Sequence, residues 1–190
     1  MNTSIMIVGV GGQGTLLASK ILGTVVLSQG CDVKVSEVHG MSQRGGSVVT
    51  YVKYGQKIAS PIVDEGEADV VLAFEQLEAA RWLPYLKPGG KLIANTQQMD
   101  PMPVITGAAA YPQGIFESLR GAGVALQELD ALALAQKAGG AKAVNVVLLG
   151  ALARHLAFPR AVWEDAIRAT VKPAFADMNR KAFGLGWETE

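Results

Sequence analysis

The sequence predicts an α/β fold, with a Rossmann-like, mainly parallel sheet, helices on both of its faces and a small antiparallel hairpin. Short β-branched apolar runs alternate with longer segments in which apolar residues recur at helical spacing. A glycine-rich stretch separates the first apolar run from the first helical segment, and no internal repeat, low-complexity tract or linker interrupts the chain. At 190 residues the chain is therefore expected to form a single domain, residues 1–190.

The first third of the chain is predicted to contain strands around one helix. We expect a buried strand at Ile5–Val8, a helix at Thr15–Ser28, an alternating strand at Asp32–Val38 and a further strand at Ser47–Tyr54. Gly55 is expected to turn the chain into Lys57–Ser60, which would form an antiparallel hairpin with the preceding strand.

The middle of the chain continues the alternation of strand and helix. We expect a buried strand at Asp69–Phe74, an amphipathic helix at Glu75–Leu86, a strand at Lys91–Asn95 and an edge strand at Val124–Leu129. Pro84 is expected to shorten the helix, and the following KPGG stretch predicts a strong turn. A loop rich in Met and Pro is expected over Thr96–Thr106.

The C-terminal part is predicted to be helical. Asp130 is expected to cap a helix that ends near Gly139 and Gly140. A nearly continuous apolar helix is expected over Ala143–Leu156, and two more helices are expected to begin at Pro159 and Pro173, because proline suits a first helical turn.

Charge and composition disfavour a nucleic-acid binder and favour a protein partner. Lys plus Arg and Asp plus Glu number 17 each and form no block of like charge, whereas nucleic-acid binding needs a basic surface. Only 18% of the residues are charged and 49% are hydrophobic, which indicates that a permanent partner covers apolar surface. A large core in a monomer and a homodimer of the isolated chain remain alternatives.

The single cysteine and the N-terminus indicate a cytoplasmic protein. Cys31 alone allows no internal disulfide and no cysteine-ligated iron–sulfur cluster held by this chain by itself. The opening MNTSIMIVGV lacks the basic region and the cleavage site of a signal peptide. The longest apolar run, Ala143–Ala153, is too short to span a membrane, so no membrane association is expected.

A glycine loop, GVGGQG, follows the first predicted strand. Gly9, Gly11 and Gly14 form GxGxxG between a strand and a helix, the context in which this motif binds phosphates at a helix N-terminus. Gly12 adds flexibility, Gln13 adds a neutral amide, and Glu37 lies where an acid that binds ribose is expected. A close-packed turn and a docking site for a partner loop remain alternatives. Nicotinamide binding is disfavoured, because no catalytic constellation follows.

A polar loop, HGMSQRGG, follows the second predicted strand. If the first two strands are neighbours, both loops lie on one rim of the sheet. The candidate rim residues here are His39, Ser42, Gln43, Arg44, Gly45 and Gly46. Arg44 is expected to pair with a carboxylate or phosphate, or else in an ion pair at a surface or interface. His39 is either an acid–base group or a hydrogen-bonded residue at the strand end.

Other residue patterns narrow the chemistry further. Met41 is expected to pack, and His155 to be structural, so no residue receives a catalytic role. The motifs HExxH, GxSxG and GxxxxGK[ST] are absent, and the chain holds two histidines, so a metal site, a serine hydrolase and a P-loop ATPase are disfavoured.

Five stretches together resemble the small subunit, or gamma domain, of the 2-oxoacid:ferredoxin oxidoreductases. They are GVGGQGTLLASKIL (Gly9–Leu22), EVHGMSQRGGSV (Glu37–Val48), SPIVDEGEADVVLAFE (Ser60–Glu75), NVVLLGAL (Asn145–Leu152) and MNRKAFGLG (Met178–Gly186). The pairing of the glycine loop with a QRGG loop is the specific part of the resemblance. HGMSQRGG is more similar to the indolepyruvate, or arylpyruvate, branch than to the tyrosine- and proline-containing loop of pyruvate-type members.

The resemblance implies a reaction in which an arylpyruvate and coenzyme A give an aryl-acetyl-CoA, carbon dioxide and two electrons for ferredoxin. It also implies that thiamine diphosphate and iron–sulfur clusters belong to a large partner subunit, and that the two loops contribute to a pocket or a coenzyme A channel. Two other hypotheses remain, since a fold alone does not determine function. They are a free-standing nucleotide-dependent dehydrogenase and a non-catalytic nucleotide-sensing module.

Overall fold

A computed structural model describes residues 2–40 and 45–189. Within these residues six strands form one sheet in the order β2-β3-β1-β4-β5-β6. Their bounds are β1 (Thr3–Val10), β2 (Asp32–His39), β3 (Ser47–Gly55), β4 (Ala68–Ala73), β5 (Leu86–Asn95) and β6 (Ala125–Leu129). β3 is antiparallel to both β1 and β2, while the pairings of β1 with β4, β4 with β5 and β5 with β6 are parallel. The prediction of a mainly parallel sheet is confirmed.

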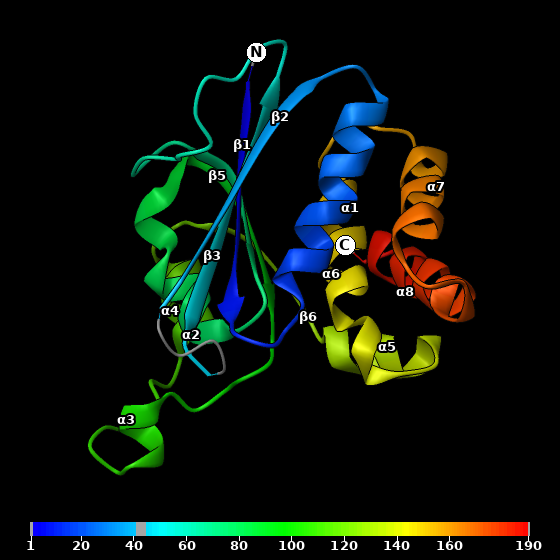
Figure 1. The fold of residues 1–190 in the computed structure, drawn as a ribbon. Coiled ribbons are helices and arrows are strands. Elements are labelled where there is room, and N and C mark those ends of the chain that lie inside the picture. The colour runs from blue at the N-terminus through cyan, green and yellow to red at the C-terminus, as the bar shows by residue number, and fades with distance from the viewer. Residues whose placement is uncertain (1, 41–44, 190) are drawn as a thin grey trace.

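Helices cover both faces of this sheet, as predicted (Figure 1). One face is covered by α1 (Thr15–Ser28), α5 (Ala131–Ala138), α6 (Val144–Ala153), α7 (Arg160–Thr170) and α8 (Ala176–Trp187). The other face carries α2 (Gln76–Arg81) and α4 (Ile115–Gly121), and the short α3 (Met102–Ile105) projects away from the body of the molecule. Each face has its own apolar core.

The central strand β1 is buried on both faces because its residues alternate between the two cores. Ile5 and Ile7 pack against the α1 side, whereas Met6 and Val8 pack against the α2 side, and all four are 0% exposed. A strand between two helical layers needs apolar residues at every position. The unbroken apolar run in the sequence therefore predicts this position correctly.

The predicted hairpin between Ser47–Tyr54 and Lys57–Ser60 is wrong. β3 pairs instead with β2 on one side and with β1 on the other, so neither of its edges is left for the following segment. The carboxyl group of Asp32, at the start of β2, accepts a hydrogen bond from the Ile58 N–H at 2.8 Å and fixes that segment outside the sheet. The antiparallel hairpin of this fold is β2–β3.

The predicted turn at KPGG is also wrong, because this stretch lies inside β5. The helix before it is shorter than predicted: α2 ends at Arg81, and Pro84 lies in the 3₁₀ turn η1 (Leu83–Tyr85). Along the β4–β5 pairing, β5 advances from Leu86 to Lys91 while β4 advances only from Ala68 to Val70. The strand thus takes up the glycines as an irregularity instead of reversing direction.

The C-terminal helices lie close to their predicted positions. The carboxyl group of Asp130 caps α5 by accepting a hydrogen bond from the Ala133 N–H at 2.9 Å, and β6 is an edge strand, so both predictions are confirmed. Pro159 directly precedes α7. The 3₁₀ turns η2 (Ala141–Ala143) and η3 (Pro173–Phe175) lead into α6 and α8. The sequence pattern gave no indication of α4, nor of α3 within the Met- and Pro-rich loop.

The helices of the described residues are too short, or not apolar enough, for any of them to cross a membrane.

Candidate functional site

The glycine loop and the end of the polar loop lie on one rim, although the strands before them are not neighbours. β3 lies between β1 and β2, so the condition of neighbouring strands, under which the two loops were expected to meet, does not hold. Because β1 and β2 are both antiparallel to β3, they run in the same direction and their carboxyl ends reach the same edge of the sheet. The Gly11 N–H donates to the Gly46 carbonyl at 2.9 Å, and the Gly45 N–H approaches the Gly11 carbonyl at 3.5 Å.

A cavity of about 350 Å³ opens between these two segments. Its described lining residues are Gly11, Gly12, Gly14, Thr15, Leu16, Glu37, His39 and Val48. The candidate residues Ser42, Gln43 and Arg44, together with Met41, lie outside the described residues, so their roles stay predictions. The structure therefore brings together the glycine loop, Glu37 and His39, which the sequence pattern singled out separately.

The start of α1 suits an anionic ligand. Gly14 has a left-handed backbone, with φ of 88°, and no side chain among the described residues caps the helix. Intrahelical bonding begins at the Leu17 N–H, which donates to the Gly14 carbonyl at 3.2 Å, so the Thr15 and Leu16 amides find no acceptor within the described residues. The first turn of α1 also contains no acidic residue. Free amides at the positive end of the helix dipole favour a bound anion.

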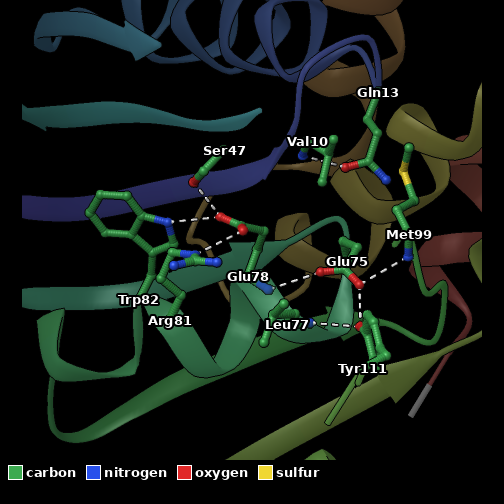
Figure 2. A network of polar contacts seen from close by, with 10 residues as sticks. All are labelled: Val10, Gln13, Ser47, Glu75, Leu77, Glu78, Arg81, Trp82, Met99 and Tyr111. Atoms are coloured by element: carbon green, nitrogen blue, oxygen red, sulfur yellow. Dashed lines mark hydrogen bonds and ion pairs between the residues drawn. The ribbon is translucent and has the colours of Figure 1, made fainter. Parts of the chain in front are cut away.

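Gln13 shapes the glycine loop from inside. Its Oε1 accepts a hydrogen bond from the Val10 N–H at 2.7 Å (Figure 2). Its Nε2 donates to the Phe74 carbonyl at 3.1 Å and to Gln97 Oε1 at 3.3 Å. A Cβ atom on Gly9 would come within 2.7 Å of Gln13 Oε1 and 2.9 Å of Phe74 Cβ. Gln13 thus fastens the glycine loop to Phe74 at the end of β4, and Gly9 leaves the space that this contact needs. The neutral amide that the sequence offers at Gln13 is therefore already bonded within the protein.

Asn145, on α6, supports the same loop from the other side. Its buried Nδ2 donates to the Gly14 carbonyl at 3.2 Å, across 131 residues of sequence. A Cβ atom on Gly14 would lie 2.6 Å from that nitrogen. A polar residue inside an otherwise apolar helix was the one sequence signal that could have pointed to it.

Glu37 and His39 supply the polar groups on the β2 side of the cavity. Glu37 is exposed and its Oε2 accepts a hydrogen bond from Thr50 Oγ1 at 3.3 Å. His39 is exposed, with Nδ1 3.1 Å from the Gly40 carbonyl. A carboxylate opposite free amides can accept hydrogen bonds from hydroxyl groups of a ligand whose anionic group faces the amides. Glu37 thus reaches the cavity even though β2 does not adjoin β1.

His155 lies away from this rim. Its Nε2 is 2.8 Å from Gln127 Oε1, in agreement with the structural role expected for it. Partial burial, with Lys91 and Arg154 nearby, lowers its pKa below the usual value. No group of three or more His, Cys, Asp or Glu side chains in the described part of the chain is arranged to hold a metal ion.

Known proteins resemble this chain in both sequence and fold. The family model described as "Pyruvate ferredoxin/flavodoxin oxidoreductase" matches residues 4–189. The chain is 44% identical over 191 residues to "Indolepyruvate oxidoreductase subunit IorB" of Pyrococcus horikoshii, which covers 96% of this chain and 93% of that protein. It is 26% identical over 177 residues to the "Pyruvate/ketoisovalerate oxidoreductases common subunit gamma" of Thermococcus kodakarensis, over 92% of this chain and 89% of the relative.

A solved structure with the same fold is that of pyruvate oxidoreductase subunit PORC from Thermotoga maritima. It has a TM-score of 0.77 and 23% sequence identity, and the match covers 99% of this chain and 96% of that one. The family model spans nearly the whole sequence, and the archaeal relative covers it at well over a third identity. The chain therefore belongs to the pyruvate ferredoxin/flavodoxin oxidoreductase family.

Proposed function

We propose that this chain is the small subunit of an arylpyruvate ferredoxin oxidoreductase of the indolepyruvate type. The observation that carries the proposal is the contrast between two relatives: identity is 44% to the indolepyruvate oxidoreductase subunit and 26% to the pyruvate/ketoisovalerate subunit. Both matches cover more than nine tenths of the chain, so the difference reflects the whole sequence and not one motif.

The proposed reaction is an oxidative decarboxylation. An arylpyruvate anion and coenzyme A give an aryl-acetyl-CoA, carbon dioxide, one proton and two electrons, which pass to ferredoxin. Thiamine diphosphate and the iron–sulfur clusters are assigned to a large partner subunit in the cytoplasm. One cysteine in this chain is too few for a cluster held by four thiolates, which supports that division.

This chain's part in the reaction is to bind and orient a ligand at the rim. The Thr15 and Leu16 amides at the start of α1 would hold an anionic group of the ligand, and the Glu37 carboxyl group would accept hydrogen bonds from hydroxyl groups of the same ligand. Coenzyme A carries both kinds of group. We assign to Arg44 the pairing with an anion of substrate, coenzyme A or cofactor, and we place Ser42, Gln43 and His39 on the same rim.

The test is reconstitution of the complex. The isolated chain is expected to be colourless and unable to oxidise arylpyruvates, whereas the complex with the large subunit is expected to reduce ferredoxin when both arylpyruvate and coenzyme A are present. Arylpyruvate oxidation by the purified small chain alone would contradict the proposal.

The same preparations separate the two alternatives. Binding of NAD to the isolated chain, measured by calorimetry, would favour a dehydrogenase. Nucleotide binding without association with any thiamine-containing subunit would favour a sensing module.

A further inference from the structure

Two glutamate side chains are buried side by side at the start of α2. Glu75 is 1% exposed and Glu78 is 4% exposed. A buried carboxyl group costs several kcal/mol unless hydrogen-bond donors satisfy its oxygens. The donors that surround these two groups therefore indicate what the pair holds in place.

Glu75 holds the segment between β5 and α4. Its Oε2 caps α2 by accepting a hydrogen bond from the Glu78 N–H at 3.0 Å. Its Oε1 accepts hydrogen bonds from the Met99 N–H at 3.1 Å and from the Tyr111 hydroxyl (Figure 2). Tyr111 in turn accepts a hydrogen bond from the Leu77 N–H at 3.2 Å. Burial, and then the bond to Glu75, raise the pKa of Tyr111 well above its usual range, so the hydroxyl keeps the proton that it donates.

Glu78 holds the first residue of β3. Its Oε2 accepts hydrogen bonds from the Ser47 hydroxyl and from Trp82 Nε1, the latter at 3.1 Å, and its Oε1 accepts one from Arg81 Nε at 3.0 Å (Figure 2). Ser47 directly follows Gly46, whose carbonyl accepts the hydrogen bond from Gly11. Glu78 is thus connected to the glycine loop through two hydrogen bonds, its own with Ser47 and the one between Gly46 and Gly11.

A helix cap alone does not require these contacts. Capping a helix of six residues would need only the bond from Glu75 to the Glu78 amide. The other bonds reach 24 residues to Met99, 36 residues to Tyr111 and, from Glu78, 31 residues to Ser47. The two segments that they hold face each other across a cavity of about 240 Å³, which is lined by Gly45, Gly46 and Ser47, by Met99, Pro101 and Met102, and by both glutamates.

We propose that Glu75 and Glu78 are positioning residues, which fix the Gly45–Ser47 segment and the Met99–Tyr111 segment in one relation to each other. The first turn of α2 is the common support, because each segment is bonded to its own glutamate and the two glutamates share a hydrogen bond. Loosening one segment should therefore loosen the other, and with it the Gly11–Gly46 contact at the glycine loop.

Hydrogen exchange in the full-length isolated chain tests this coupling. The reporters are the Met99 amide, bonded to Glu75, and the Gly11 amide, bonded to Gly46. Tyr111→Phe removes a donor to Glu75, and Ser47→Ala removes a donor to Glu78. Each substitution is expected to speed exchange at both reporters by about tenfold, the effect of losing a hydrogen bond to a charged group.

The matched control for this experiment is Tyr51→Phe. Tyr51 is 9% exposed and packs in the same core, but its hydroxyl makes no hydrogen bond within the described residues. It should leave both reporters unchanged. If Tyr111→Phe speeds exchange only at Met99, and Ser47→Ala only at Gly11, the two segments are independent and the inference is wrong.

A second experiment rests on the proposed function. In the complex reconstituted at saturating large subunit, Glu78→Gln leaves too few acceptors for the donors around it. It is expected to raise the KM for coenzyme A by about tenfold while kcat changes little. Ser47→Ala should act in the same direction, and the double variant should lose no more than Glu78→Gln alone, because Glu78 acts through Ser47.

The control for the kinetics is Glu164→Gln, which breaks a helix-surface ion pair with Arg160 at 2.9 Å. It should leave KM unchanged. A KM of Glu78→Gln and of Ser47→Ala equal to that of this control would overturn the kinetic role. If the wild-type complex shows no turnover, the proposed function fails, while the exchange experiment still decides whether the two segments are coupled.

Discussion

At the scale of single residues, glycines in one short loop serve different physical needs. Gly12 and Gly14 have φ of 102° and 88°, a left-handed backbone that side chains disfavour. Gly9 has no such conformation, and glycine is needed there because a Cβ would meet Gln13 and Phe74. At Gly14 both needs apply, because Asn145 fills the space where a Cβ would lie.

This difference between the glycines gives a prediction for stability. Gly12→Ala should lower the free energy of unfolding by about 1–2 kcal/mol from backbone strain, since nothing lies within 4 Å of a Cβ there. Gly14→Ala should cost the same strain and about 1–3 kcal/mol more, because Asn145 must move. Urea unfolding of both variants measures the two terms. Equal losses would show that Asn145 moves aside freely and does not hold the loop.

Residue patterns could predict part of the site. The spacing of Gly9, Gly11 and Gly14 and the position of Glu37 can be read from local sequence, and in the structure Gly11, Gly14 and Glu37 line one cavity. Glu75 and Glu78 could not be found in this way, since their partners lie tens of residues away. Asn145 stands out as a polar residue in an apolar helix, but no local spacing reveals that its partner is Gly14. Ser42, Gln43 and Arg44 stay predictions.

At the scale of elements, α6 and α8 pack with their backbones in contact. A Cβ on Gly186 would overlap the Val147 carbonyl, and one on Gly150 would overlap the Phe183 carbonyl. These glycines come from NVVLLGAL and MNRKAFGLG, the two late stretches of the family resemblance. Their role in the structure is close packing of two helices.

A substitution in this helix pair should be severe. Gly186→Ala is expected to lower the free energy of unfolding by about 3 kcal/mol or more, or to prevent folding, because backbone atoms cannot rotate away as side chains do. Gly23→Ala in α1 is the matched control: it is a buried helical glycine with nothing within 4 Å of a Cβ. It should be neutral or stabilise by about 0.5–1 kcal/mol. Similar stability of the two variants would contradict the close approach.

The predictability of elements follows from how local their causes are. The long helices α1 and α6 were predicted from their own sequences, α1 from its helical spacing of apolar residues and α6 from its nearly continuous apolar run, and so was the Asp130 cap. The hairpin was assigned to the wrong pair because the choice of a strand partner depends on which edges the finished sheet leaves free. The short helices α3 and α4 have four and seven residues, too few for a periodic signal, and α4 is held by the burial of Ile115, Phe116 and Leu119.

At the scale of the whole molecule, the order of the strands determines where the site lies. The sequence predicted a mainly parallel sheet with helices on both faces, and this is confirmed. Three successive strands without a helix, β2, β3 and β4, interrupt the alternation of strand and helix, but no local pattern shows which strands pair, so the insertion of β3 between β1 and β2 could not be predicted. The two candidate loops still meet, since the insertion preserves the common direction of β1 and β2.

Two carboxyl groups make the stability of the molecule depend on pH in the acid range. The Ile58 N–H, and then Lys34, lower the pKa of Asp32, and Lys53 does the same for Glu67. Each carboxyl group is thus ionised in the folded state at a pH where it is already protonated in the unfolded chain. Its stabilisation is present above the usual pKa values of 3.8 and 4.5 and is lost as the pH falls through the lowered ones.

His155 adds a separate dependence nearer to neutral pH. Its pKa is lowered from 6.5, chiefly by burial, so the unfolded chain binds a proton there before the folded chain does. The free energy of unfolding should therefore fall as the pH drops from 6.5 toward the lowered value, and fall again in the acid range of Asp32 and Glu67. His155→Gln keeps a group that can bond to Gln127 but does not titrate. In that variant, urea midpoints measured across this range should no longer fall just below pH 6.5, but should still fall in the acid range of Asp32 and Glu67. A wild-type midpoint that stays constant from pH 6.5 down to the range of the carboxyl groups would show that His155 titrates alike in the folded and unfolded chains.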